Sequence, residues 1–157
     1  MMTEDSLIAA IPEHCFGMTS RLATRSTSKV FANLLAPLEL EVTQFPIMVM
    51  LRLHSSILVS ELSRLLDIEA SGISRNIQAL ERKGAVVCSG GRGRNGKQVA
   101  LSASGQILLD EAVVRWKQAQ QMLIEELGEE EALLVRQAMK NLSAAAQRIL
   151  SRERGVR

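Results

Sequence analysis

Residues 57–102 have the sequence ILVSELSRLLDIEASGISRNIQALERKGAVVCSGGRGRNGKQVALS. The segment 59–66 carries its apolar residues on one face of a helix, and the segment 69–83 repeats apolar residues at i, i+4 and i+7. Those three positions are Ile73, Ile77 and Leu80. With only two residues between the segments, the stretch predicts two short helices joined by a tight turn.

The second half of the same stretch predicts a β-hairpin. Residues 85–88 form a β-prone run, residues 89–96 contain four glycines, and residues 97–101 supply the returning strand. Gly84 occupies the place of a C-terminal helix cap, directly after two cations. The order is therefore helix, turn, helix and hairpin.

Helical patterns precede this stretch. A first helix is expected over residues 15–40, with Pro37 bending or ending it. Thr43 is expected to cap a second helix over residues 44–54, whose first turn tolerates Pro46. That second helix is apolar on most sides, which is typical of a core helix.

A long helical region follows the stretch. Ser102 is expected to cap it, and Gly128 divides it into two helices. With 157 residues, 46% hydrophobic and only 3% aromatic, the chain suits one globular, mainly α-helical fold with a small β element.

The positive charge is concentrated. Residues 70–104 contain six cations and one anion, a net charge of +5, whereas the whole chain carries +2 and the remainder therefore −3. Such a cluster is often only a solvated surface, but beside a helix–turn–helix pattern it is the charge distribution of a nucleic-acid contact.

Other classes of protein are disfavoured. Two cysteines far apart, Cys15 and Cys88, indicate free thiols, and neither they nor His14 and His54 have the spacing of a known metal site. Phosphate-binding loops, nucleophile elbows and paired-carboxylate motifs are absent from the sequence. The start of the chain is acidic and no apolar run is long enough for a membrane span. We therefore expect a soluble, cytoplasmic protein without enzymatic activity, cofactor or metal.

The predicted second helix has a polar outer face. If its three apolar positions face the core, then Ser71, Ser74, Arg75 and Gln78 project outward, and all four side chains form hydrogen bonds with base edges or phosphates. Arg75 is the first choice because a guanidinium binds guanine through two hydrogen bonds. The alternative is an ordinary solvated face of an amphipathic helix.

The hairpin tip adds a second type of contact. Its glycines allow close approach to a backbone, and Arg92, Arg94 and Lys97 neutralise phosphates or enter a minor groove. The alternative is an exposed turn without a ligand.

Four segments together resemble the MarR family of winged helix–turn–helix regulators, and the resemblance covers nearly the whole chain. They match the family's entry into its second helix, its next helix, its recognition helix and its exit from the wing, and only their ordered combination is specific. The segments are LEVTQF (40–45), LVSEL (58–62), SGISRNIQALERKG (71–84) and VALSASG (99–105).

The resemblance implies a homodimer that binds double-stranded DNA at a pseudo-palindrome. It assigns residues 1–38 and 104–157 to an interleaved helical dimerisation region and residues 39–103 to the winged helix–turn–helix domain. It adds Asn76 to the residues of the recognition helix expected to contact DNA. Many relatives carry Asp-x-Arg in the wing, where this chain has Gly93 and Asn95, so Arg92 or Arg94 would have to replace that arginine.

The resemblance also implies a signal that releases a repressor from DNA. The usual family effector is a small, often aromatic molecule, for which Phe16, Met48, Met50 and Trp116 are candidate pocket residues. An alternative is a peroxide sensor of the same fold using Cys15, although the chain lacks the tyrosines that usually accompany that thiolate. A second alternative is a helical adaptor that does not bind DNA, which the basic wing disfavours.

Overall fold

The computed structural model describes residues 4–91 and 96–155. The chain forms two compact units, residues 1–116 and 117–157. The elements in chain order are α1 (Glu4–His14), α2 (Phe16–Leu35), the 3-10 turn η1 (Ala36–Leu38), α3 (Phe45–His54), β1 (Ile57–Leu58), α4 (Val59–Leu66), α5 (Ala70–Arg82), β2 (Val86–Gly90), β3 (Lys97–Leu101), α6 (Ala103–Leu127) and α7 (Glu129–Gly155). Helices dominate, with one small sheet, as the sequence predicts.

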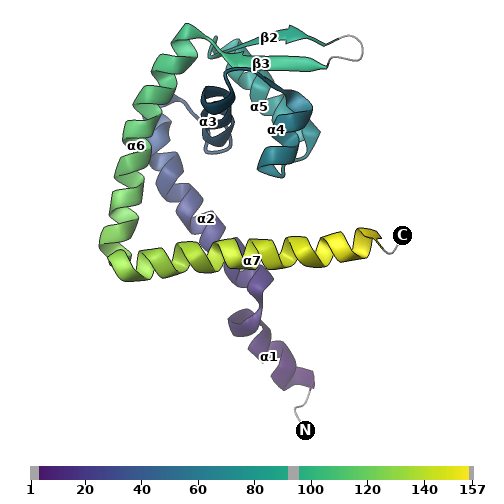
Figure 1. The fold of residues 1–157 in the computed structure, drawn as a ribbon. Coiled ribbons are helices and arrows are strands. Elements are labelled where there is room, and N and C mark those ends of the chain that lie inside the picture. Colours follow the sequence, from purple (N-terminus) through teal and green to yellow (C-terminus); the bar gives the residue numbers. More distant parts are fainter. Residues whose placement is uncertain (1–3, 92–95, 156–157) are drawn as a thin grey trace. The chain divides into compact units, whose positions relative to one another are not determined.

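The sheet is antiparallel, with strand order β1-β3-β2. In the hairpin Cys88 lies opposite Val99, and Val99 in turn lies opposite Ile57 of β1. Helices α3, α4 and α5 gather on one side of the β2–β3 hairpin (Figure 1). Strand β1 was not predicted, because two residues between a helix and a helix are too short for any periodicity to show.

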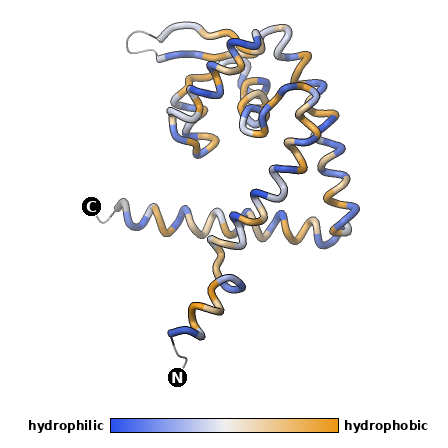
Figure 2. The backbone as a smooth tube through the Cα atoms, turned by 180° about the vertical axis from the view of Figure 1, so that it is seen from behind, coloured by the Kyte–Doolittle hydropathy of each residue, from blue (hydrophilic) through white to orange (hydrophobic). Residues whose placement is uncertain are grey.

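The core lies where α3, α4 and α5 meet the sheet. Ile73, Ile77 and Leu80 are each at most 1% exposed, so the predicted inward face of α5 is confirmed. They pack in one cluster with Leu62 of α4 and Leu51 of α3, among others. In Figure 2 hydrophobic and hydrophilic residues alternate along α4 and α5, as amphipathic packing requires.

Several predicted helix boundaries are confirmed. Helix α2 ends at Leu35, before a 3-10 turn that contains Pro37. Gly84 follows α5 with a φ of +71°, the left-handed conformation of a glycine cap. The Ser102 hydroxyl accepts a hydrogen bond from the backbone N–H of Gly105 and so caps α6, while Gly128 separates α6 from α7.

The prediction that Thr43 caps the second helix is wrong. The N-cap position of α3 is Gln44, and the hydroxyl of Thr43 donates instead to Asn76 of α5. Pro46 lies in the first turn of α3, as expected. The prediction failed because the competing partner lies 33 residues away and leaves no local signal.

None of the described helices is both long enough and apolar enough to cross a membrane.

Gly105 fixes the junction between the hairpin and α6. A Cβ atom there would overlap the carbonyl oxygen of Ala85, which is buried and accepts a hydrogen bond from Ser102 N–H. The Ser102 and Ser104 hydroxyls donate to the neighbouring carbonyl oxygen of Gly84. The hairpin is thereby joined tightly to the start of α6.

We predict that Gly105→Ala lowers the free energy of unfolding by about 1–3 kcal/mol, because the backbone must move to admit the methyl group. Gly17→Ala is the matched control, since its Cβ would meet only the Cys15 sulfur at 3.7 Å. Urea unfolding at one fixed protein concentration gives the free energy of unfolding of both variants and of wild type. Equal stability of the two would contradict this account of the junction.

Candidate nucleic-acid interface

Helix α5 presents a polar stripe to solvent. Ser71, Arg75 and Gln78 are exposed at spacings i, i+4 and i+7, opposite the buried face. Ser74 is half-buried and lies beside this stripe. Among the described residues, no carboxylate lies within ion-pair distance of Arg75, so its guanidinium is available to an external anion or base edge.

Asn76 is a predicted contact residue whose side chain already has partners within the protein. Its Oδ1 accepts a hydrogen bond from Thr43 Oγ1 at 2.9 Å, and its Nδ2 donates to the carbonyl oxygen of Gly72 at 2.9 Å. The side chain is half-buried. Both ends of the amide therefore have partners before any ligand arrives.

The predicted contacts of the hairpin divide into two groups. Arg92 and Arg94 lie outside the described residues. Lys97, the first residue of β3, is half-buried, and its Nζ lies 3.5 Å from the Oε2 of Glu81 near the end of α5. This pair ties β3 to α5 and lowers the charge that Lys97 offers to a phosphate.

Cys88 lies near that pair. Burial raises the pKa of the Cys88 thiol above its usual value, and the neighbouring Glu81 carboxylate raises it further, while Lys97 acts in the opposite direction. The thiol therefore stays protonated at neutral pH, where it is a weak nucleophile. Within residues 4–91 and 96–155, no group of three His, Cys, Asp or Glu side chains is placed to hold a metal ion.

Cys15 occupies the break between α1 and α2. It is half-buried and takes the N-cap position of the 20-residue helix α2, with φ −84° and ψ 108°. No cap hydrogen bond comes from its side chain. The thiol is thus placed at the N-terminus of α2.

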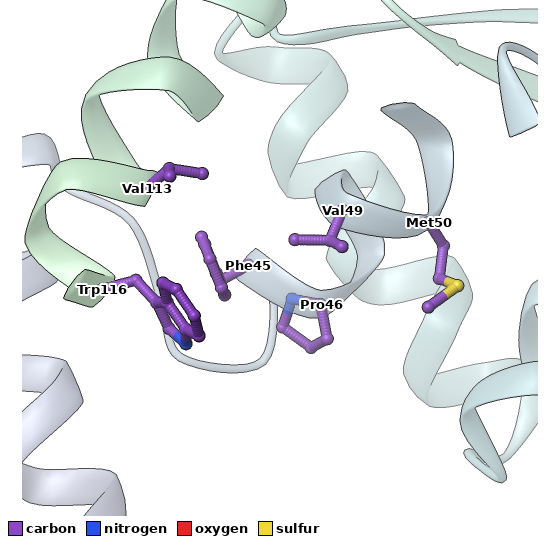
Figure 3. A pocket seen from close by; sticks show the side chains of 6 residues that line it. All are labelled: Phe45, Pro46, Val49, Met50, Val113 and Trp116. Carbon is purple, nitrogen blue, oxygen red and sulfur yellow. The ribbon is translucent and has the colours of Figure 1, made fainter. Parts of the chain in front are cut away.

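An apolar pocket lies between α3 and the first part of α6 (Figure 3). Its volume is about 350 Å³, the lower end of the range for small-molecule sites. The lining residues are Phe45, Pro46, Val49, Met50, Val113 and Trp116. Figure 3 shows Phe45 lying between the Trp116 ring and Val113, with Val49 and Pro46 on the α3 side.

Sequence reasoning identified part of this pocket. Met50 and Trp116 line it, whereas Met48 is fully buried in the core and Phe16 is 75% exposed on α2. Phe45, Val49 and Val113 were missed because only the packing of α3 against α6 brings them together.

A polar contact also joins the same two helices. The guanidinium of Arg52 on α3 lies 3.1 Å from Asp110 Oδ1 on α6, and it also donates to Gln106 Oε1 at 3.5 Å. Both charged side chains are largely exposed, at 45% and 66%, so this pair contributes at most about 1 kcal/mol.

The terminal helices expose large apolar side chains. The apolar residues on α1, α2 and the first part of α6 that are about half exposed or more include Leu7, Ile8, Ile11, Phe16, Leu22, Ile107 and Val114. Helix α7 of the second unit does the same at Leu133, Leu134, Met139, Ile149 and Leu150. Figure 2 shows hydrophobic residues recurring along α1 and α7. Exposed apolar surface is a common feature of protein–protein contacts, membrane contacts and ligand grooves.

Solved structures similar to this chain are transcriptional regulators. MosR from M. tuberculosis, solved in complex with DNA, is 28% identical, with a TM-score of 0.76 over 87% of this chain and 98% of its own. A mutant of MarR from E. coli, complexed with operator DNA, is 18% identical, with a TM-score of 0.75 over 85% of this chain and 96% of its own. A probable transcriptional regulator from Pseudomonas aeruginosa is 21% identical, with a TM-score of 0.75 over 83% and 98%. No protein-family model and no curated protein matches the sequence.

These neighbours confirm the predicted winged-helix architecture.

Proposed function

We propose that this chain, a member of the MarR family of winged helix–turn–helix transcriptional regulators, binds duplex DNA as a homodimer and represses transcription until a signal releases it. The observation that carries the proposal is the exposed stripe Ser71, Arg75 and Gln78 on a helix whose opposite face is buried. A helix exposed in this way fits the width of the major groove. The complexes of MosR and MarR with DNA support it.

Ser71, Arg75 and Gln78 would meet base edges, with Ser74 beside them. Arg92 and Arg94 of the hairpin would meet phosphates, with Lys97 contributing less because of Glu81. Such contacts suit a repressor that works in the cytoplasm on an operator with two half-sites. An adaptor without DNA-binding activity has no use for an exposed arginine on this face, and so we place it second.

The homodimer is supported by the exposed apolar residues of the terminal helices. Neither unit of the chain buries them by itself. Pairing two chains through residues 1–38 and 104–157 would remove these side chains from water. It would also present two recognition helices to half-sites about 34 Å apart.

We predict that Arg75→Ala weakens binding to the operator by about 10-fold or more, because a two-bond guanidinium contact contributes about 1–3 kcal/mol of discrimination. The operator is first recovered by selection from random duplex DNA, and binding is measured by fluorescence anisotropy across salt concentrations. The logarithm of the wild-type binding constant should fall with the logarithm of the salt concentration, with a slope of about 0.9 per phosphate contact. The complex should contain two chains per duplex.

Arg136→Ala on α7 is the matched control, since it removes the same charge from an exposed residue of the second unit, and sedimentation checks that both variants keep the wild-type oligomeric state. An affinity that does not change with salt concentration would refute the assignment of α5 as the recognition helix. So would equal losses of operator affinity in Arg75→Ala and Arg136→Ala.

For the releasing signal we propose a small uncharged aromatic molecule in the pocket between α3 and α6. The six lining side chains include no charged group, so nothing there offsets the desolvation of a carboxylate. A volume of about 350 Å³ accommodates one ring with a short substituent.

We predict that methyl benzoate perturbs the fluorescence of Trp116, the only tryptophan of the chain, and weakens DNA binding. Benzoate at the same concentration should do neither, because it must shed its hydration without a partner. Val113→Phe fills the pocket and should abolish the response to the ester while the operator is still bound. A stronger response to benzoate would contradict the assigned chemistry.

The alternative signal is a peroxide that oxidises Cys15. The position of the thiol at the N-terminus of α2 favours this reading. The thiolate would attack a peroxide oxygen, giving a sulfenic acid and releasing water or an alcohol. We predict that Cys15→Ser keeps the protein on DNA during peroxide treatment while wild type is released. If the variant leaves DNA as readily as wild type, Cys15 is not the sensor.

A further inference from the structure

One hydrogen bond joins the turn before α3 to the middle of α5. Thr43 Oγ1 donates to Asn76 Oδ1 at 2.9 Å, across a separation of 33 residues. The chemistry of the next contact fixes the orientation of the amide. The carbonyl oxygen of Gly72 only accepts, so Nδ2 must face it, and Oδ1 is left to receive the Thr43 hydroxyl.

Thr43 is firmly held at its own end. The neighbouring Gln44 is only 3% exposed, and its Oε1 accepts a hydrogen bond from the backbone N–H of Glu41 at 3.1 Å. The backbone N–H of Gln44 also donates to the carbonyl oxygen of Glu41, at 2.9 Å. The turn that carries Thr43 is closed twice and anchored by a buried side chain, so Thr43 serves as a fixed point on the core.

Asn76 is poorly suited to the interior of a helix on propensity alone. Asparagine costs about 0.5 kcal/mol relative to alanine there, and its bond to the i−4 carbonyl does not favour the helix. Reading adenine would require both Oδ1 and Nδ2 to point at the base edge. In this structure the two atoms point at Thr43 and Gly72 instead.

We propose that Asn76 is a positioning residue, and that its hydrogen bond with Thr43 sets the rotation of α5 about its own axis. The inference rests on the proposed function, because that rotation decides how Arg75 and Gln78 meet the groove. Contacts through two hydrogen bonds need side chains held within about 0.5 Å and 10–20° of the productive geometry. The apolar face seats α5 on the core, and the Thr43–Asn76 bond resists rolling of the helix on that seat.

The test compares Thr43→Val, Asn76→Ala, the double variant and Thr43→Ser with wild type. For each, affinity is measured for the selected operator and for a scrambled duplex of equal length, over a range of salt. Thr43→Val and Asn76→Ala should each lower the ratio of operator affinity to scrambled-duplex affinity about 5- to 10-fold. Neither should change the slope of affinity against salt. The double variant should be no worse than either single one, and Thr43→Ser should restore the ratio because it keeps the hydroxyl.

Repeating the DNA selection with each variant separates positioning from base reading. Gln78→Ala, as the reader control, should change the preferred base at one position. Asn76→Ala and Thr43→Val should instead weaken preference at several positions alike. The proposal is overturned if Asn76→Ala weakens the base preference at a single operator position. It is also overturned if the fold-loss of the affinity ratio in the double variant is the product of the two single losses.

Thermal unfolding without DNA provides an independent measurement. The effects of the two single changes should be non-additive there as well, which shows the bond in the free protein. Additive effects on stability would overturn the proposal even if the variants lose DNA specificity as expected. Wild type that selects no sequence at all would overturn the proposed function, and the role of Asn76 with it.

Discussion

The burial of Ile73, Ile77 and Leu80 beneath α5 is the interaction on which the rest of this structure depends. Each side chain is almost fully enclosed, and each contributes about 1.5–3 kcal/mol, more than any exposed ion pair of the chain. Because a helix has 3.6 residues per turn, burying these three leaves Ser71, Arg75 and Gln78 no direction but outward. The polar stripe is therefore a consequence of the core.

Charge acts on this scaffold by position more than by total. A net charge of +2 would attract DNA only weakly, yet the stretch 70–104 holds +5. Within that stretch the cations differ: among the residues that the structure describes, Arg75 has no carboxylate within ion-pair distance, whereas Lys97 lies 3.5 Å from Glu81. Lys97 therefore offers less of its charge to a phosphate than Arg75 does.

What the sequence could predict follows from how local each feature is. Helix α5, the hairpin, the Gly84 cap and the Ser102 cap depend on residues within a few positions of one another, and all four were predicted. Strand β1 forms by pairing with β3. The Thr43 hydroxyl donates to Asn76 and does not cap α3 as the sequence predicts. The pocket needs α3 and α6 side by side, so its lining could be predicted only in part. Non-local contacts have no period in the sequence.

Helix α3 connects the two parts of the proposed function. Its preceding turn carries Thr43 and so reaches α5, its middle walls the pocket, and its last turn holds Arg52 against Asp110 of α6. A ligand shifts DNA affinity only if it prefers one arrangement of these elements over another. A ring that enters between Val49 and Val113 would favour a wider separation of α3 from α6. The exposed ion pair resists this weakly, whereas Leu109 and Ala112 of α6, buried in the same core cluster as α3, limit how far it can go. Under the proposed functions, moving α3 would also move Thr43, and its hydrogen bond with Asn76 would carry the displacement to the face proposed to meet DNA.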